Sequence, residues 1–271
     1  MAAEASARVV LEWTPSLPGV ALGDRYGSAA LATLEPFAHA IRGRSEPVMF
    51  SILGPLTRAL DLARRAPTPG LLGSLVTRIA DSIVAVVARI AEVAPGAPVL
   101  AVLDEPALRR CEHPSHPLPP RLTAPALSQL GEMVSPVADL GVRVGEGAHL
   151  SSIVGSGVHL LAVPLSSVAT QAPALAAHVA AGGVVAWGAV PVDEPHGAGT
   201  HRLWRRLASA WNDVAAEGVE PDQVRERSFI CPNGSLESFT VSQAYEVVTL
   251  ADDLGRVART EALGPHLGIG A

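Results

Sequence analysis

Carboxyl and hydroxyl side chains directly follow two apolar runs in the first half of the sequence. Asp104 and Glu105 come after the run at 98–103, and Thr57 follows the run at 47–53, in a GPLT turn. Adjacent carboxylates can bind a cation or act as a general base. A turn that opens a helix offers backbone N–H groups and, in this case, a hydroxyl. We therefore expect Asp104 and Glu105 to be catalytic and Thr57 to bind substrate.

A structural role is the alternative for the two carboxylates. One of them could cap a helix while the other pairs with an arginine such as Arg58 or Arg109. Arg143 is expected at the end of a short strand, where its guanidinium could bind a substrate carboxylate or phosphate. The alternative for Arg143 is an ion pair with Glu146 or Glu105.

Two turns in the second half of the sequence carry further candidates. Asp193 and Glu194 lie in the sequence VPVDE, and Cys231 and Asn233 lie in the turn CPNGSL. A carboxyl group at such a place can transfer a proton, although acidic residues in loops are usually only solvated. We expect Asp193 to be an acid–base residue, with Glu194 as its neighbouring alternative, and Cys231 and Asn233 to bind substrate.

A C-x-H-x-x-H run, formed by Cys111, His113 and His116, lies in the loop after the sequence DEPAL. Zinc in proteins takes four ligands in a tetrahedral arrangement, and one short loop with several prolines rarely surrounds an ion. Cys231 could approach this loop, but no fourth ligand is evident. We expect a solvated loop and no metal site, with a metal site as the alternative.

Six apolar runs predict strands that are buried on both faces. They read as continuous apolar segments, which is typical of parallel sheets covered by helices. The runs are Pro47–Leu53, Pro98–Leu103, Val142–Val144, Val158–Val163, Gly183–Val190 and Arg227–Cys231. Helical spacing of apolar residues predicts helices at 70–93, 200–216 and 241–259, the last with Thr240 as its N-cap.

Strands and helices alternate at the interval of a (β/α)8 barrel, but two strands are missing. Residues 2–13 read as a helix and 16–28 as an extended connection, so no strand is expected before Pro47. We therefore predict the α/β class and a TIM-type (β/α)8 barrel that is incomplete or irregular at its N-terminal side. Residues 1–46 would form an N-terminal helix and an irregular segment, and 47–271 the barrel.

The composition excludes several kinds of function. All 20 cationic residues are arginines, so no lysine is present for a Schiff base or a phosphate-binding loop. The net charge of −6 provides no basic field for nucleic acid. The first residues lack the pattern of a signal peptide, and apolar runs are interrupted within about 10 residues, too short to cross a bilayer. We expect a cytoplasmic protein that binds a small molecule, and neither nucleic acid nor a membrane.

The motifs GPLT, DEPAL, GAV and CPNGSL, in this order and followed by a long helix, resemble the C-terminal domain of cobalamin-independent methionine synthase. A more distant resemblance is to uroporphyrinogen decarboxylase. The likeness covers 47–259. It implies a barrel that transfers a methyl group from a methyl-folate to the thiolate of homocysteine, which zinc activates. It also implies that Asp104 holds the amino group of the substrate.

The zinc ligands of that family have no match in this sequence. The family has His-x-Cys, Glu and Cys at three places where this chain has RVGEG at 143–147, Pro164 and Gly234. Cys231 lies three positions before Gly234 in the sequence. Zinc tolerates ligand displacements of only about tenths of an ångström, so Cys231 does not replace the family's cysteine. The general acid of the family, a histidine, aligns with 191–194. We expect no zinc at the family positions, and the cofactor is unknown, a folate being one possibility.

Three functional interpretations follow. The first, which we favour, is an enzyme that transfers a methyl or one-carbon group to a small molecule without the zinc site. The second is a non-catalytic paralogue that binds a ligand or a partner subunit, forming a homo- or hetero-oligomer through its N-terminal side. The third is a uroporphyrinogen-decarboxylase-like lyase, in which Arg143 and Asp104 bind a carboxylated substrate.

Overall fold

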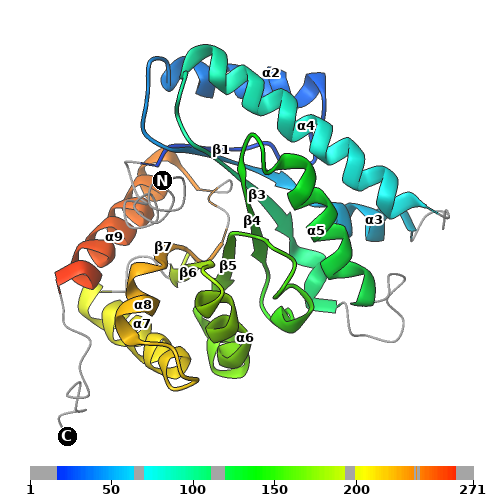
Figure 1. Cartoon of the computed structure of the whole chain (residues 1–271). Coiled ribbons are helices and arrows are strands. Elements are labelled where there is room, and N and C mark those ends of the chain that lie inside the picture. The colour runs from blue at the N-terminus through cyan, green and yellow to red at the C-terminus, as the bar shows by residue number, and fades with distance from the viewer. Residues whose placement is uncertain are drawn as a thin grey trace, which may run out of the picture. The chain divides into compact units, whose positions relative to one another are not determined.

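The computed structural model describes residues 17–63, 70–110, 120–192, 199–234, 236 and 239–260 (Figure 1). The described residues fall into two compact units, which we call the N-terminal unit (17–162) and the C-terminal unit (163–260). The border between them lies within strand β5 (Leu160–Pro164).

Parallel strands form the sheet of the N-terminal unit. Each strand pairs in parallel with the one that follows it in the sequence. The strands are β1 (Gly19–Ala21), β2 (Val48–Leu53), β3 (Val99–Glu105), β4 (Asp139–Val144) and β5. Most side chains of β2 and β3 are buried, which is why both strands read as continuous apolar runs in the sequence.

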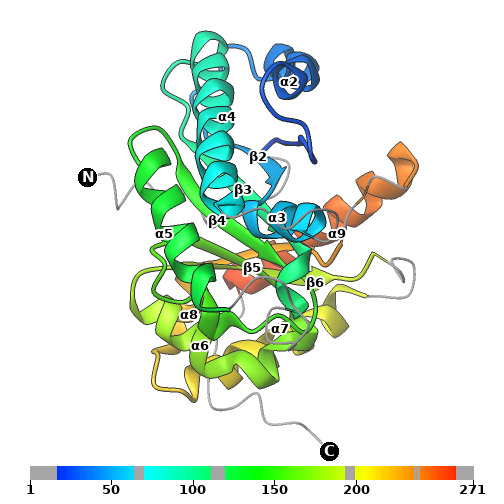
Figure 2. The same cartoon turned by 90° about the vertical axis from the view of Figure 1, so that its right-hand side faces the viewer.

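Four α-helices connect these strands. They are α2 (Ser28–Ala40), α3 (Pro55–Ala63), α4 (Leu71–Val93) and α5 (Thr123–Val134), with short 3₁₀ turns η2 (Pro106–Arg110), η3 (Pro120–Leu122) and η4 (Leu150–Ser152). Helix α4 packs against α2, α3 and α5 (Figure 2). Its buried side chains recur at helical spacing, as Leu75, Ile79, Ile83, Val86 and Ile90 illustrate.

By length and composition, α4 is long and apolar enough to cross a membrane. The sequence predicted that every apolar run would be too short to cross a bilayer, and α4 differs from that prediction. The few charged residues of this 23-residue helix lie on one side, so they do not interrupt its apolar side. Buried helices of soluble proteins have the same property, and the apolar face of α4 packs within its own unit.

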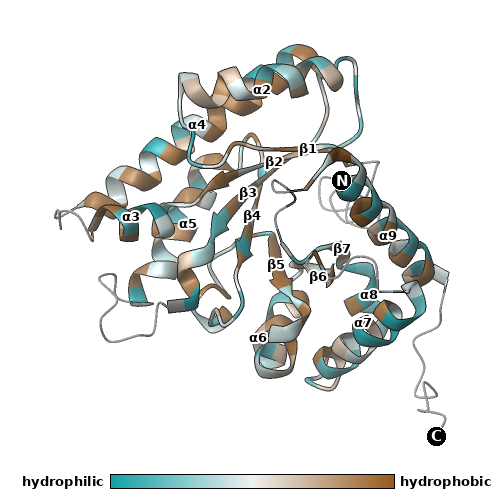
Figure 3. Ribbon diagram, turned by 180° about the vertical axis from the view of Figure 1, so that it is seen from behind, coloured by the Kyte–Doolittle hydropathy of each residue, from teal (hydrophilic) through white to brown (hydrophobic). Residues whose placement is uncertain are grey.

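The C-terminal unit contains two paired parallel strands and their helices. They are β6 (Val184–Val190), β7 (Ser228–Pro232), η5 (Leu165–Ser167), α6 (Val168–Ala180), α7 (Thr200–Ala215), α8 (Pro221–Glu226) and α9 (Val241–Thr260). Trp187 is fully buried in β6 and donates its Nε1–H to Oγ of Ser228 at 2.6 Å. Helix α7 packs against α6, α8 and α9, and its two faces differ in hydropathy (Figure 3).

The predicted class is confirmed, because the described strands pair in parallel and alternate with helices. All six predicted strands and the helices predicted at 70–93, 200–216 and 241–259 are present, with ends shifted by a few residues. The helix predicted at 2–13 lies outside the described residues. Thr240 is the N-cap of α9, as predicted. Its Oγ1 accepts the N–H of Gln243 at 3.4 Å, and its own N–H donates to Oε1 of Gln243 at 3.0 Å, which completes a capping box. The closed (β/α)8 barrel stays a prediction, since the described residues form seven strands.

The expectation of no strand before Pro47 is wrong. Gly19–Ala21 forms β1 and pairs with Met49–Ser51 of β2. A strand of three residues is too short to produce a hydrophobic pattern, and its glycine lowers its strand propensity. Its pairing with β2 therefore decides its conformation.

Candidate active site

The carboxyl ends of β2, β3 and β4 bring predicted site residues to the same level of the sheet. In the parallel register, Leu53 pairs with Asp104, and Asp104 pairs with Arg143. The Nε of Arg143 donates to Oδ1 of Asp104 at 2.5 Å. The Asp104 side chain is 15% exposed and that of Arg143 is 46% exposed. The pair is therefore accessible to solvent mainly through its guanidinium.

This ion pair is not one that the sequence suggested. Glu146 or Glu105 was the expected partner of Arg143, and Arg58 or Arg109 was the expected partner of a carboxylate. The register decides otherwise, because residues opposite each other on neighbouring strands lie only about 5 Å apart.

Glu105 is fully buried and caps the first turn of α3. Its Oε1 accepts the N–H of Leu56 at 2.9 Å, and its Oε2 accepts both the N–H and the hydroxyl of Thr57, each at 2.6 Å. N–H groups of a first helical turn have no partner within the helix, and an acidic side chain satisfies them well. Oγ1 of Thr57 also accepts the N–H of Ala107 at 3.2 Å. The donors of the GPLT turn thus bind a carboxylate of this same chain.

Glycine at position 54 leaves the space that the Glu105 carboxylate occupies. A Cβ atom at Gly54 would lie 2.1 Å from Oε1 of Glu105 and 2.4 Å from its Cδ. The N–H of Gly54 donates to the carbonyl of Asp104 at 2.9 Å, which holds the turn against the end of β3.

Burial raises the pKa of Glu105 to about 7. The hydrogen bonds from Thr57 and Leu56 favour the carboxylate and act in the opposite direction, and the neighbouring charge of Asp104 raises the pKa further. The loss of hydration is the dominant effect at this position.

The predicted roles of Glu105 and Thr57 are therefore less favoured than the structural alternative. Both side chains are buried, and they bind each other at the start of α3. Of the candidates in this unit, Asp104 and Arg143 are the two that have access to solvent.

Tyr26 is a further residue at this edge, and its sequence context does not predict it. Its hydroxyl donates to the carbonyl of Leu53 at 2.7 Å. Burial raises the pKa of Tyr26 to about 12, so the phenol is neutral at physiological pH. A single tyrosine in a Gly-containing connection has no sequence signal for such a role, because its partner is 27 positions away.

The candidates of the C-terminal unit lie at the end of β7. Cys231 is buried, and Asn233 is exposed. Oδ1 of Asn233 accepts the N–H of Val192 at 3.0 Å, and its backbone N–H donates to the carbonyl of Val190 at 2.9 Å. Gly188 allows this close approach, because a Cβ there would lie 3.0 Å from Cα of Asn233. Asn233 thus joins the segment after β7 to the segment after β6.

We expect Asn233→Ala to lower the free energy of unfolding by about 0.5–1.5 kcal/mol, because the N–H of Val192 loses its acceptor. Asn233→Asp keeps an oxygen at that position and should be close to neutral. Urea unfolding followed by tryptophan fluorescence measures both variants. Equal destabilisation by the two substitutions would contradict this role of the carboxamide oxygen.

Several predicted residues lie outside the described residues. These are Asp193 and Glu194, together with Cys111, His113 and His116. Within the described part of the chain, no group of three or more His, Cys, Asp or Glu side chains could hold a metal ion. The prediction for the C-x-H-x-x-H loop is therefore untested, as is the prediction that zinc is lost.

Solved structures with a similar fold include a methyltransferase and a candidate methionine synthase. A methyltransferase from Methanosarcina mazei superposes with a TM-score of 0.51 and 13% identity, over 83% of this chain and 64% of the other. A candidate vitamin-B12-independent methionine synthase from Listeria monocytogenes gives a TM-score of 0.52 and 10% identity, over 79% and 63%. No family model matches the sequence, and no curated protein matches it significantly.

At this level of identity, the likeness concerns the fold alone. This chain spans less than two thirds of the length of either protein. The parallel α/β architecture of this chain is thus one that methyltransferase and methionine-synthase-like proteins also have.

Proposed function

We propose that this chain is a methyl- or one-carbon-transferring enzyme with a methionine-synthase-like (β/α)8 barrel, and that its small-molecule substrate binds at the Asp104–Arg143 pair. The observation that carries this proposal is the position of the pair at the carboxyl ends of β3 and β4. Active sites of parallel α/β barrels lie at this end of the strands. The fold of the two similar structures supports the class of reaction.

The chemistry of the pair fits a substrate that carries both an ammonium and a carboxylate group. The oxygens of Asp104 can accept hydrogen bonds from an ammonium group. The Nε–H of Arg143 donates to Asp104. The other N–H groups of a guanidinium can bind a carboxylate through two parallel hydrogen bonds. In this proposal Asp104 and Arg143 orient the substrate, while Asp193 stays the predicted acid–base residue.

One observation favours a second candidate, a ligand-binding protein without catalysis. Glu105, whose pKa is raised to about 7, is buried as the cap of α3 and is not exposed to a ligand. If Asp193 is not an acid catalyst either, the Asp104–Arg143 pair would bind a ligand without transforming it.

We expect Arg143→Gln to weaken the binding of α-amino acids by about tenfold or more, because a charge-assisted hydrogen bond to the carboxylate is lost. Asp104→Asn should weaken amino acids similarly but leave the corresponding acids without an amino group almost unchanged. Calorimetric titration with homocysteine, methionine and their deaminated analogues measures this. Arg89→Gln is the matched control, because Arg89 also forms an ion pair, with Glu35 at 2.8 Å, away from the carboxyl edge.

An activity assay separates the two candidate functions. With a methyl-folate as donor and homocysteine or another small nucleophile as acceptor, the enzyme interpretation predicts product formation that Asp104→Asn reduces. Binding without product for every pair of donor and acceptor would favour the non-catalytic candidate. Amino-acid affinities that neither Asp104→Asn nor Arg143→Gln changes would refute a substrate site at this pair.

A further inference from the structure

Two arginines from different helices of the N-terminal unit lie around Tyr26. The guanidinium of Arg78, on α4, lies 5.7 Å from the centroid of the Tyr26 ring. Burial raises the pKa of the Tyr26 phenol, and the positive charge of Arg58, on α3, acts on that pKa in the opposite direction. The first turns of α3 and the middle of α4 thus direct positive charge to the same tyrosine.

The position of Tyr26 is fixed from two sides. Its hydroxyl donates to the carbonyl of Leu53 at the end of β2, at 2.7 Å. The next residue, Gly27, donates its N–H to Oγ of Ser82 on α4 at 3.3 Å. Oγ of Ser82 in turn donates to the carbonyl of Arg78 at 3.0 Å. These bonds hold the backbone next to Tyr26 against the backbone of α4 at Arg78.

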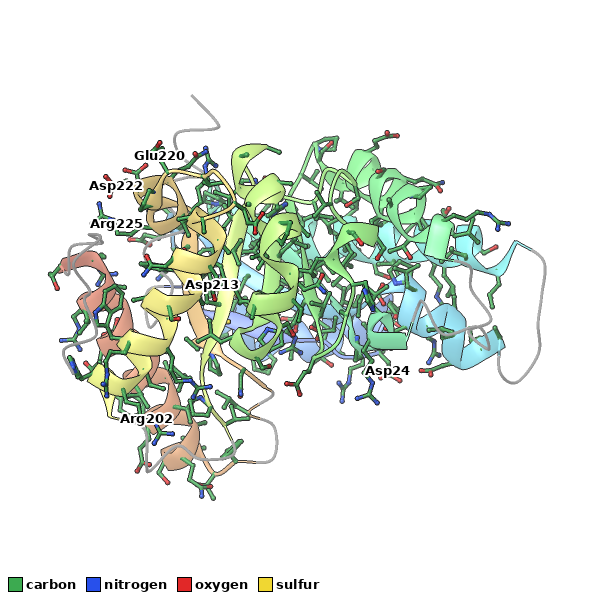
Figure 4. The ribbon with its side chains drawn as sticks, turned by 90° about the horizontal axis from the view of Figure 1, so that it is seen from below. Asp24, Arg202, Asp213, Glu220, Asp222 and Arg225 are labelled. Atoms are coloured by element: carbon green, nitrogen blue, oxygen red, sulfur yellow. The ribbon has the colours of Figure 1, made fainter. Side chains whose placement is uncertain are left out.

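Neither arginine has a carboxylate partner among the residues that the structure describes. Arg58 is half-buried, and Arg78 is exposed. The acids whose charges reach Tyr26 are Asp24, which is exposed (Figure 4), and Glu105, which is engaged as the cap of α3. Arg58 has lost part of its hydration without gaining a carboxylate among the described residues, and Arg78 presents its guanidinium to solvent. Both can bind an anion through their N–H donors.

We propose that Arg58 and Arg78 form an anion-binding site for a carboxylate or phosphate group, with Tyr26 as a positioning residue. Leu53, which anchors Tyr26, is paired with Asp104 in the sheet. Since neighbouring strands lie about 5 Å apart, the site is within reach of a small ligand that also contacts Asp104 or Arg143. Binding of the anion does not rest on the proposed methyl transfer. If that function holds, the anion is a second charged group of the same substrate or of its methyl donor.

The test is calorimetric titration of the full chain with inorganic phosphate and, separately, with succinate, at constant ionic strength. We expect Arg58→Gln and Arg78→Gln each to weaken binding of the preferred anion by about tenfold, as the loss of one charge-assisted contact does. Arg58→Lys keeps the charge but loses the planar fork, so its affinity should lie between those of the wild type and Arg58→Gln. A preference for phosphate or for succinate identifies the chemical source of the anion.

Arg202→Gln is the matched control. Arg202 is an exposed arginine of α7 that also has no ion pair within the described residues (Figure 4). An unchanged affinity in Arg202→Gln together with weakened binding in both site variants supports the proposal. No binding of either anion, equal losses in all variants, or losses confined to Arg202→Gln would overturn it. If Arg58→Gln does not fold, Arg78→Gln and Arg58→Lys decide the question. The amino-acid titrations of Arg143→Gln test the other site, so failure of one proposal is distinguishable from failure of the other.

Discussion

Gly54→Ala is expected to destabilise the N-terminal unit by about 2–4 kcal/mol, although it adds a single methyl group. The new Cβ would lie 2.1 Å from Oε1 of Glu105, so the carboxylate must move. Moving it leaves the N–H groups of Leu56 and Thr57 without an acceptor in a buried place. Urea unfolding followed by circular dichroism measures the loss, and hydrogen exchange of the first turn of α3 locates it.

Gly73→Ala is the control for this substitution. Gly73 lies in α4, and a Cβ there would meet no atom within 4 Å. Alanine in a helix is favoured over glycine by about 0.5–1 kcal/mol, so Gly73→Ala should stabilise the protein. If Gly54→Ala were as well tolerated as Gly73→Ala, the close packing of Glu105 against the turn would be wrong.

The stability of the N-terminal unit is expected to fall as the pH rises from about 5 to 8. Burial raises the pKa of Glu105 from its usual 4.5 to about 7. Between these two values the folded state holds a proton that the unfolded state has released, so the free energy of unfolding decreases with rising pH. The contribution of Glu105 is thus fully present below pH 4.5 and is lost as the pH passes about 7. A shift of this size corresponds to a change on the order of 3 kcal/mol.

Glu105→Gln tests the assignment of this pH dependence. Glutamine does not titrate, so the fall in stability between pH 5 and 8 should disappear or become much smaller. At pH 5 the folded state holds Glu105 protonated, and a protonated carboxyl group, like glutamine, has one acceptor oxygen and one donor, so we expect a loss of only about 1 kcal/mol at pH 5. Urea unfolding of both proteins at several pH values gives both quantities. A slope that is the same in wild type and Glu105→Gln would assign the pH dependence to other groups.

The local pattern of the sequence was sufficient for most elements of the fold. The run at 98–103 predicted β3 because a strand buried on both faces must be apolar throughout. The spacing of apolar residues at 70–93 predicted α4, and Thr240 predicted the start of α9, because a cap and a helical period are properties of a few neighbouring residues. Strand β1 was missed since three residues carry no periodicity, and only the pairing with β2 reveals it.

The candidate site depended more on tertiary structure. The sequence identified Asp104, Glu105, Thr57 and Arg143 by their positions after strands, and the structure brings all four to the carboxyl edge of the N-terminal unit. It did not identify Tyr26, because hydrogen bonds and ring contacts between distant segments leave no local pattern.

By itself, the sequence determined that two adjacent carboxylates stand at the end of β3, and therefore that they point to opposite faces of the strand. Only the tertiary structure decided what each of them meets. The register of β3 with β4 places Asp104 beside Arg143, where water and a ligand can reach the pair. The packing of α3 and the absence of a side chain at Gly54 enclose Glu105 completely. The two neighbours differ in role because alternation along a strand is a local property, whereas the hydration and the partners of a side chain depend on the segments that fold around it.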